Sequence, residues 1–257
     1  MEVKNSLPYV EIVVTTHCNL NCKDCANLIS SYKHPYHIDI NIIIKSIQVL
    51  LEIFDSIEVI GVLGGEPFLY PKLKNLIDYL CGEEKIGKIR LVTNGTIFIS
   101  EHTFLQSLKN QKVCIQVNQY PQISQNKALE ICELLENNYI KYFYIDRSKE
   151  KWKNFGDGVI ADKDIETLRK QFKNCDMKCR SILNGKMYYC PRSAHGNDLG
   201  IIKEISYVDL ISDSISLEDR KKKVNDLLFK NKYLEACRMC NAGTDIFTEI
   251  DAAVPKT

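Results

Sequence analysis

The cysteines of this chain are grouped, and that grouping restricts the fold more than any other feature of the sequence. Eight of the eleven lie in three short segments, at 18–25, 175–190 and 237–240. An odd number of cysteines cannot all pair in disulfides within one chain, and the N-terminus has no signal-peptide pattern, so we expect a cytoplasmic protein. In a reducing compartment, grouped cysteines usually bind metal or carry out redox chemistry. The fold must therefore bring distant thiols together at metal sites.

Charge and hydropathy argue against several classes of protein. The 257 residues include 34 basic and 33 acidic side chains, which leaves a net charge of +1. That balance does not favour a nucleic-acid or membrane-surface partner. No apolar stretch is long enough to span a bilayer. We therefore expect neither a nucleic-acid nor a membrane partner.

The first two thirds of the chain alternate β-rich runs with helical patterns. Parallel neighbours need crossover helices, so repeated strand–helix units build a parallel sheet. Five or six units favour an α/β fold with an open, partial (β/α)6-type barrel over a closed eightfold one. The strands are expected at 10–15, 57–63, 88–93, 113–118 and 141–146, and the helices at 39–54, 71–80, 100–108, 124–135 and 162–173.

Polar or conformationally special residues follow each expected strand. In parallel α/β folds the carboxyl edge of the sheet is where ligands bind, so we expect the site there. The residues concerned are His17-Cys18, Gly64–Glu66, Asn94-Gly95, Gln119-Tyr120 and Arg147.

From Cys175 onward the pattern changes. Asn184-Gly185 lies between two short apolar runs and predicts a two-residue hairpin. A helix is expected over about 216–230 with Ser216 as its cap, followed by a CxxC pair. We expect a main domain over 1–174 and a small cysteine-bearing appendage over 175–257, and we expect the tail from Asp251 to fray.

The first cysteine group reads CNLNCKDC and contains Cys18, Cys22 and Cys25. Three thiolates on a loop that leaves a strand can hold three irons of a cubane, so the fourth iron stays open to a small molecule. The alternative is a structural zinc site, which needs four ligands. His17 would have to turn back on Cys18 to supply the fourth.

With Gly64-Gly65-Glu66-Pro67 after the second strand, this CxxxCxxC segment resembles the radical S-adenosylmethionine superfamily. The resemblance implies that the three cysteines bind a [4Fe-4S] cluster, whose open iron takes the methionyl amine and carboxylate of S-adenosylmethionine. It implies reductive cleavage of that cofactor to a 5′-deoxyadenosyl radical, which abstracts hydrogen from the substrate. A flavodoxin- or ferredoxin-type electron donor is expected.

The same resemblance implies how the cofactor is held. Gly64, Gly65, Glu66 and Pro67 are expected to contact the methionyl amine, with Glu66 as the counter-charge. Consecutive glycines let a backbone approach a ligand closely, and a carboxylate pairs with an ammonium group.

Three amides close the third and fourth strands, where the family places ribose and carboxylate contacts. They are Asn94, Asn118 and Gln119. Loop capping is the alternative role for each of them. One departure from the family is Asp24, which stands where an aromatic residue usually packs near the adenine, so the adenine contact must come from elsewhere.

The remaining cysteines resemble the twitch type of C-terminal domain, which holds one auxiliary [4Fe-4S] cluster. The longer SPASM type holds two clusters and uses more cysteines than remain here. A structural zinc in the same cage is the alternative. The candidate ligands are Cys175, Cys179, Cys190, Cys237 and Cys240.

Which four of these five bind is left open by the sequence. Family spacing favours Cys175. Hairpin geometry favours Cys179, because pairing Leu183 with Lys186 places Cys179 opposite Cys190, close enough for both thiolates to reach one cluster.

An auxiliary cluster can accept an electron from a substrate radical, and one twitch enzyme of the family oxidises an aminocyclitol in this way. By that analogy we expect a radical oxidoreductase acting on a polar small molecule, sugar-like or phosphorylated. Arg192 could hold phosphate or carboxylate, and His195 or Tyr120 could take a proton from a hydroxyl. Further residues expected to face the cavity are Arg147, Trp152 and Asn154.

Two rival functions remain. The first is a maturase of ribosomally made peptides, which would need a precursor peptide as partner. The segment before Cys18 is too short for a peptide-recognition domain, which favours a small-molecule substrate. The second rival is a zinc-stapled binding protein without enzymatic activity.

Overall fold

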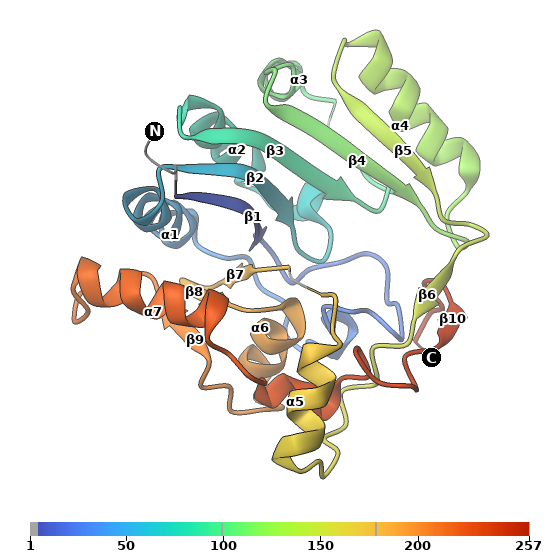
Figure 1. The fold of residues 1–257 in the computed structure, drawn as a ribbon. Helices are drawn as coiled ribbons and strands as arrows, with labels where there is room; N and C mark the ends of the chain where they lie inside the picture. Colours follow the sequence, from blue (N-terminus) through green and yellow to red (C-terminus); the bar gives the residue numbers. More distant parts are fainter. Residues whose placement is uncertain (1–4, 99, 178, 257) are drawn as a thin grey trace.

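The computed structural model describes residues 5–98, 100–177 and 179–256. Its main sheet has eight strands in the order β5-β4-β3-β2-β1-β7-β8-β9 (Figure 1). The first five are parallel neighbours, as the alternating pattern predicts. Because β5 and β9 are the two edges of this sheet, the barrel is partial. The parallel strands are β1 (Ser6–Val13), β2 (Ser56–Leu63), β3 (Ile86–Thr93), β4 (Val113–Gln119) and β5 (Tyr142–Asp146).

Four helices cover the outer face of the parallel strands (Figure 1). The predicted cap of the first one is confirmed, because the side chain of Asp39 accepts a hydrogen bond from the Asn41 amide. Leu50 and Leu76 from the helices and Ile60 and Ile89 from the strands are 0% exposed. Each such side chain stabilises the fold by roughly 1.5–3 kcal/mol through burial alone. The helices are α1 (Ile40–Ile53), α2 (Leu73–Gly82), α3 (His102–Leu108) and α4 (Gln125–Asn137).

The second part of the chain extends the main sheet. β7 (Ser181–Leu183) lies parallel to β1, and β8 (Lys186–Tyr188) and β9 (Tyr207–Asp209) follow it antiparallel. The predicted hairpin is confirmed: Asn184 and Gly185 have φ of 48° and 78°, the left-handed values that a two-residue turn of this kind requires. The division into domains at residue 174 stays a prediction.

Three further helices lie in the lower half of the molecule in Figure 1, and three short 3-10 turns connect elements of the fold. Ser216 caps α7 as predicted, accepting a hydrogen bond from the Asp219 amide. The helices are α5 (Ile165–Lys173), α6 (Pro191–Asp198) and α7 (Leu217–Phe229). The 3-10 turns are η1 (Ile29–Ser31), η2 (Pro67–Leu69) and η3 (Glu235–Met239).

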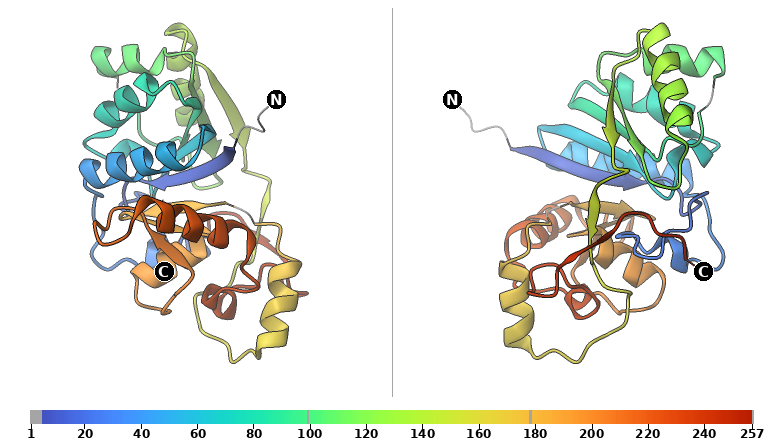
Figure 2. Two further views of the ribbon diagram at one scale, coloured as in Figure 1. Left: turned by 60° about the vertical axis from the view of Figure 1, so that its left-hand side comes forward. Right: turned by 90° about the vertical axis from the view of Figure 1, so that its right-hand side faces the viewer.

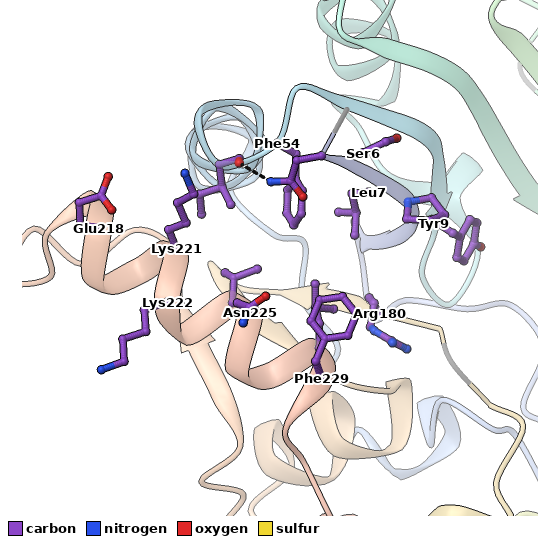
Figure 3. A pocket seen from close by; sticks show the side chains of 15 residues that line it. Ser6, Leu7, Tyr9, Phe54, Arg180, Glu218, Lys221, Lys222, Asn225 and Phe229 are labelled. Carbon is purple, nitrogen blue, oxygen red and sulfur yellow. Dashed lines mark hydrogen bonds between the residues drawn. The ribbon is translucent and has the colours of Figure 1, made fainter. Parts of the chain in front are cut away.

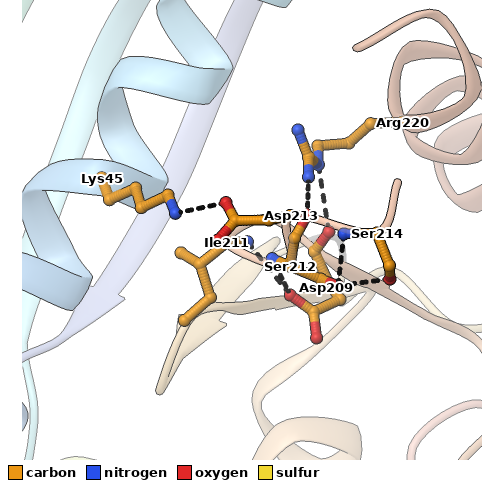
Figure 4. Close-up of polar contacts among 7 residues, drawn as sticks. All are labelled: Lys45, Asp209, Ile211, Ser212, Asp213, Ser214 and Arg220. Atoms are coloured by element: carbon orange, nitrogen blue, oxygen red, sulfur yellow. Dashed lines mark hydrogen bonds and ion pairs between the residues drawn. The ribbon is translucent and has the colours of Figure 1, made fainter. Parts of the chain in front are cut away.

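A polar cluster ties α7 to α1 (Figure 4). Arg220 of α7 donates to the carbonyl of Asp209, at the end of β9, and to that of Ser212 in the loop before the helix. Lys45 of α1 pairs with Asp213 of the same loop at 2.9 Å. The bonds of Arg220 hold the loop against α7, and the exposed Lys45–Asp213 pair links that loop to α1.

The end of the chain lies along the first cysteine loop, so the expectation that it frays is wrong. β10 (Glu249–Asp251) pairs antiparallel with β6 (Lys151–Lys153). Farther on, the Lys23 amide donates to the Val254 carbonyl at 2.8 Å, and the Lys256 amide donates to the Asn21 carbonyl at 2.6 Å. These backbone hydrogen bonds attach the end of the chain to the loop. We call residues 249–256 the C-terminal strap; Figure 2 shows it beside the loop.

Across the described ranges, none of the helices combines the length and the apolar character that crossing a bilayer requires.

Candidate active site

The carboxyl edge of the parallel strands opens into a cavity of about 410 Å³. The three cysteines of the first group line it. Other predicted residues around it are Gly64, Gly65, Asn94, Asn118, Tyr120 and Trp152. The sequence pointed to no role there for Lys151, Lys153 or Phe155, which also line it. These three belong to or follow the short β6, which no periodicity in the sequence reveals.

The two glycines after β2 let the cysteine loop pack against the strand end. A Cβ on Gly65 would lie 2.2 Å from the His17 carbonyl oxygen, and one on Gly64 would lie 2.4 Å from that of Thr15. The Gly65 amide donates to the Thr15 carbonyl at 2.9 Å. The two glycines therefore allow the strand end to approach the protein's own cysteine loop closely, which a side chain would prevent. They also line the cavity.

Glu66 is a buried strut between strand ends. Its side chain is 0% exposed, and it accepts hydrogen bonds from the Phe68 amide, the Thr93 hydroxyl and the Asn94 amide at 2.8–3.1 Å. Burial raises the pKa of this carboxyl to about 7. Glu66 and Pro67 are absent from the cavity lining, so their predicted contact with a methionyl amine stays a prediction that this placement does not favour.

The predicted amides differ in position. The Asn94 Nδ2 group lies 3.0 Å from Asn19 Oδ1 and 3.9 Å from Cys18 Sγ, so it is an N–H donor beside a thiol of the first group. Asn118 also lines the cavity, with its Oδ1 accepting from Arg147 Nε at 2.9 Å. Gln119 instead donates to backbone carbonyls and caps its own loop.

The thiols of the first group fit an iron–sulfur cluster in their donor chemistry. Burial raises the pKa of Cys18 to about 11 and that of Cys22 to about 12. The thiols therefore stay protonated at neutral pH until a metal displaces the protons. Three thiols beside an open cavity match three irons of a cubane with the fourth left accessible.

An aromatic wall faces these cysteines. Tyr120 and Trp152 meet edge to face, with ring centroids 5.5 Å apart. Burial raises the pKa of Tyr120 to about 12. The phenol is therefore protonated at neutral pH and suited to donate a hydrogen bond, whereas the sequence suggested a proton acceptor. Asn154 is turned away, with its Oδ1 accepting from the Gly156 amide.

The second cysteine group lines a separate cavity of about 50 Å³. Its four members are Cys175, Cys190, Cys237 and Cys240. Cys190 precedes α6 as its N-cap, and Cys237 lies in η3. Burial raises the pKa of Cys190 and Cys237, and neighbouring cysteines of the group add to the rise. The tertiary structure therefore places Cys175 beside the other three, the arrangement that family spacing favours, and its role as a ligand stays a prediction.

Cys179 lies outside this group. The hairpin pairs Leu183 with Lys186 as predicted, but the ladder ends at Ser181 and Tyr188, so the expected opposition of Cys179 and Cys190 is not made. The physical reason is that the Arg180 carbonyl bonds the Glu11 amide of β1 at 2.7 Å, while Cys190 begins α6. The thiol of Cys179 instead hydrogen-bonds the Glu11 carboxyl group.

The two cavities are neighbours. Ala26 and Phe155 line both of them. The two cysteine groups, more than 140 residues apart in the sequence, therefore face a common wall. Within the described ranges, no three His, Cys, Asp or Glu side chains are gathered tightly enough to hold a single metal ion.

The two remaining predicted residues follow Cys190 on α6. Arg192 lines the cavity of the second group, and its Nη2 donates to the Met239 carbonyl at 2.6 Å. His195 is 0% exposed, and its Nδ1 lies 2.9 Å from the Tyr32 hydroxyl. Burial lowers the pKa of His195 to about 3. His195 lines neither cavity, so its role as a general base stays a prediction that this placement does not support.

A larger cavity, of about 710 Å³, lies away from both groups, between the beginning of β1 and α7 (Figure 3). Leu7, Phe54 and Phe229 give it an apolar lining, with Lys221 and Lys222 at its rim. It opens at the amino edge of the sheet, opposite the cysteines.

Comparison with known proteins places these observations in a family. A family model of the Radical SAM superfamily matches residues 12–144, just over half of the chain. The antilisterial bacteriocin subtilosin biosynthesis protein AlbA of Bacillus subtilis is 29% identical over 105 residues, 41% of this chain and 22% of AlbA. The GTP 3′,8-cyclase of Syntrophomonas wolfei is 28% identical over 97 residues, 37% of this chain and 29% of the cyclase. The matches thus span less than a third of either relative.

Among solved structures, the crystal structure of BtrN in complex with AdoMet and 2-DOIA aligns with a TM-score of 0.59 at 15% identity. The alignment covers 98% of this chain and 99% of that one. At this level of identity the likeness concerns the fold, including the part of the chain after Cys175.

Proposed function

This chain belongs to the radical SAM superfamily, a family of enzymes that use S-adenosylmethionine and a [4Fe-4S] cluster, and from that premise we propose that it catalyses a radical two-electron oxidation of a polar small molecule, sugar-like or aminocyclitol-like. One observation carries the proposal. A second group of four cysteines lines a small cavity that shares Ala26 and Phe155 with the larger cavity of the first group. Such an arrangement suits an auxiliary cluster that removes an electron from a substrate held between the two.

In this proposal Cys18, Cys22 and Cys25 would hold the first cluster, with the open side of the loop toward the cavity. When bound, the cluster and cofactor supply one electron and a 5′-deoxyadenosyl radical that takes a hydrogen atom from the substrate. Asn94 would donate its amide N–H toward the sulfur of Cys18. Glu66, through its bonds to Thr93 and Asn94, would keep the ends of β2 and β3 in register around the site.

The substrate would lie against the wall opposite the cysteines. The rings of Tyr120 and Trp152 give it an apolar surface, and the protonated Tyr120 hydroxyl would donate a hydrogen bond to an oxygen of the substrate. Lys151 and Lys153 line the same cavity and are paired with Asp251 and Glu249 of the C-terminal strap. Phe155 would screen the substrate from water on the side of the second group.

Cys175, Cys190, Cys237 and Cys240 would hold a twitch-like auxiliary cluster, within the proposed 175–257 appendage. The alignment of nearly the whole chain with BtrN, solved with AdoMet and 2-DOIA, supports both this appendage and a small-molecule substrate. A flavodoxin- or ferredoxin-type protein in the cytoplasm would supply the electron.

The test is an anaerobic preparation in which iron, sulfide and zinc are measured per chain. We expect about eight irons in the parent chain and about four in a Cys18/Cys22/Cys25→Ala variant, because each [4Fe-4S] cluster holds four. With reductant and S-adenosylmethionine, the parent should form 5′-deoxyadenosine and the variant none. Stoichiometric zinc without iron, even after reconstitution, would instead support the zinc-stapled binding protein.

A second candidate function is maturation of a ribosomally made peptide. The observation that favours it is the likeness to AlbA, whose name places it in the biosynthesis of a bacteriocin. Peptides encoded beside the gene and a panel of aminocyclitols and sugars would be compared as substrates. A mass loss of two hydrogens in a sugar or aminocyclitol supports the first candidate, and a modified peptide supports the second.

A further inference from the structure

Arg192 is a buried cation with spare hydrogen-bond donors. The residue is 4% exposed. Its Nη2 donates to the Met239 carbonyl at 2.6 Å, but Nε and Nη1 have no hydrogen-bond partner among the described residues. A guanidinium that is buried with unmet donors is costly, because the water it loses is not replaced. Something that the protein chain does not provide should therefore face these two N–H groups.

The surroundings of Arg192 indicate where that partner lies. Arg192 lines the small cavity of the second cysteine group and is absent from the lining of the cavity of the first group. Its electrostatic neighbours include Cys240, Cys190 and also Cys25 of the first group. The guanidinium thus lies between the two groups but faces the second, which makes a bound anionic substrate a poor candidate for its partner.

Other positive groups surround the second group as well. Lys163 Nζ donates to the carbonyls of Cys237 and Cys240, at 2.7 and 3.0 Å. Cys190 is the N-cap residue of α6 and so lies at the amino end of that helix, where the helix dipole is positive.

The first group has a different environment. Asp24 lines its cavity. The carboxyl group of Glu66 contributes to the raised pKa of the Cys18 thiol, as a negative neighbour does. Positive charge and N–H donors near cluster sulfurs raise the reduction potential. N–H donors reach thiols of the first group too, from the Leu20 amide and Asn94 Nδ2 to Cys18, so the feature particular to the second group is the buried guanidinium of Arg192 in the lining of its cavity.

We propose that Arg192 is the counter-charge of the auxiliary cluster, donating its free N–H groups toward the cluster's sulfurs and raising its reduction potential. The inference rests on the proposed function and makes Arg192 a positioning residue. After hydrogen-atom abstraction, the substrate radical would lose one electron and one proton. The electron would pass to the auxiliary cluster and from there to the electron-transfer protein. The proton would leave to solvent.

The experiment uses the full chain with Cys18, Cys22 and Cys25 replaced by Ala, so that iron reports the second group alone. Arg192→Gln removes the charge, Arg192→Lys keeps it, and Arg169→Gln removes an exposed arginine on α5 as the matched control. Potentials are measured by EPR-monitored redox titration. In Arg192→Gln we expect the ratio of reduced to oxidised cluster at a fixed potential to fall at least about tenfold, which is about 59 mV for one electron. Arg192→Lys and the control should stay near the parent.

An unchanged potential in Arg192→Gln with iron retained would overturn the inference. If Arg192→Gln loses its iron, retention of iron at the parent potential by Arg192→Lys supports the charge. If Arg192→Gln and Arg192→Lys both lose iron while circular dichroism and melting temperature are unchanged, the inference is overturned. Arg192 would then serve only to hold the Met239 carbonyl in place. Absence of iron from the unsubstituted second group would instead refute the two-cluster function, independently of Arg192.

Discussion

The first cysteine group lies on an irregular loop beside a cavity of about 410 Å³, whereas the second lines a cavity of only about 50 Å³. The loop of the first group is supported from outside, by the glycines after β2 and by the C-terminal strap. The second group is gathered from segments that end or begin α5, α6 and η3, and it is edged by Arg192 and Lys163.

The contrast shows how one residue type can serve two purposes. An open cavity leaves room for a small molecule at the first group. In the proposed function, the small cavity of the second group and the nearby charges of Arg192 and Lys163 would favour a cluster that accepts an electron. The predictions below test this contrast by changing one group while leaving the other intact.

The largest effect is expected from removing single cysteines of the second group. Cys237→Ser should lose about four of about eight irons per chain, because one missing ligand leaves a corner of the auxiliary cluster unheld. Cys179→Ser is the matched control and should keep all of them, since Cys179 bonds Glu11 and lies outside the cavity. Iron and sulfide analysis measures both. Retention of iron by Cys237→Ser together with its loss from Cys179→Ser would reverse our assignment.

A large effect confined to the first group is expected from Gly65→Ala. The new Cβ would lie 2.2 Å from the His17 carbonyl oxygen and 2.8 Å from the Cys18 Cβ, so the loop must move. We expect loss of about four irons and of 5′-deoxyadenosine formation, with the second cluster retained. Gly82→Ala is the control, because its Cβ would meet nothing within 4 Å. Parent-like iron and cofactor cleavage in Gly65→Ala would show that the loop is not held by this contact.

A moderate effect is expected from ending the chain after Thr248, which removes the strap. The amide of Lys23 and the carbonyl of Asn21 then lose their backbone partners. The truncation is made in two backgrounds, one with only the first cysteine group and one with only the second. Compared with the untruncated chain, iron should pass to a chelator several-fold faster from the first group and at an unchanged rate from the second. A Glu249→Ala/Asp251→Ala variant removes only exposed ion pairs and should resemble the parent. Equal acceleration at both groups would mean that the strap stabilises the whole molecule.

The last effect is on stability and leaves the iron content unchanged; it concerns the seam between β1 and β7, which joins the parts that carry the two groups. Glu11 is 8% exposed there, and burial raises its pKa to about 7. Because the unfolded carboxyl ionises at a lower pH, its contribution to stability is present below about pH 4 and is lost as pH rises through 7. In the parent, the free energy of unfolding should fall between pH 5 and pH 8 as Glu11 ionises. In Glu11→Gln this fall should be smaller, by up to about 3 kcal/mol.

Urea denaturation at pH 5 and pH 8 measures this change, with Glu58→Gln as control, because Glu58 is an exposed residue near the start of β2. Glu66, whose pKa burial also raises to about 7, would account for pH dependence that remains. A pH profile of Glu11→Gln identical to that of the parent would show that Glu11 is ionised in the folded protein.

The local signals in the sequence were sufficient for the parallel part of the fold. Periodicity located all five parallel strands to within a few residues, and the caps Asp39 and Ser216 and the Asn184-Gly185 turn are formed as expected. These features depend on residues that are neighbours in the chain, so a pattern of a few positions specifies them. The first cysteine group is of the same kind, because eight consecutive residues contain all three thiols.

Contacts between distant segments were decided only by the tertiary structure. The choice of Cys175 over Cys179 depends on how β1 captures the Arg180 carbonyl, which no spacing between cysteines encodes. Likewise β6 and β10 are three residues each, too short for a periodic signal, and become strands because they pair with each other. Their pairing brings the end of the chain to the first cysteine loop, where Val254 and Lys256 bond the backbone of Lys23 and Asn21.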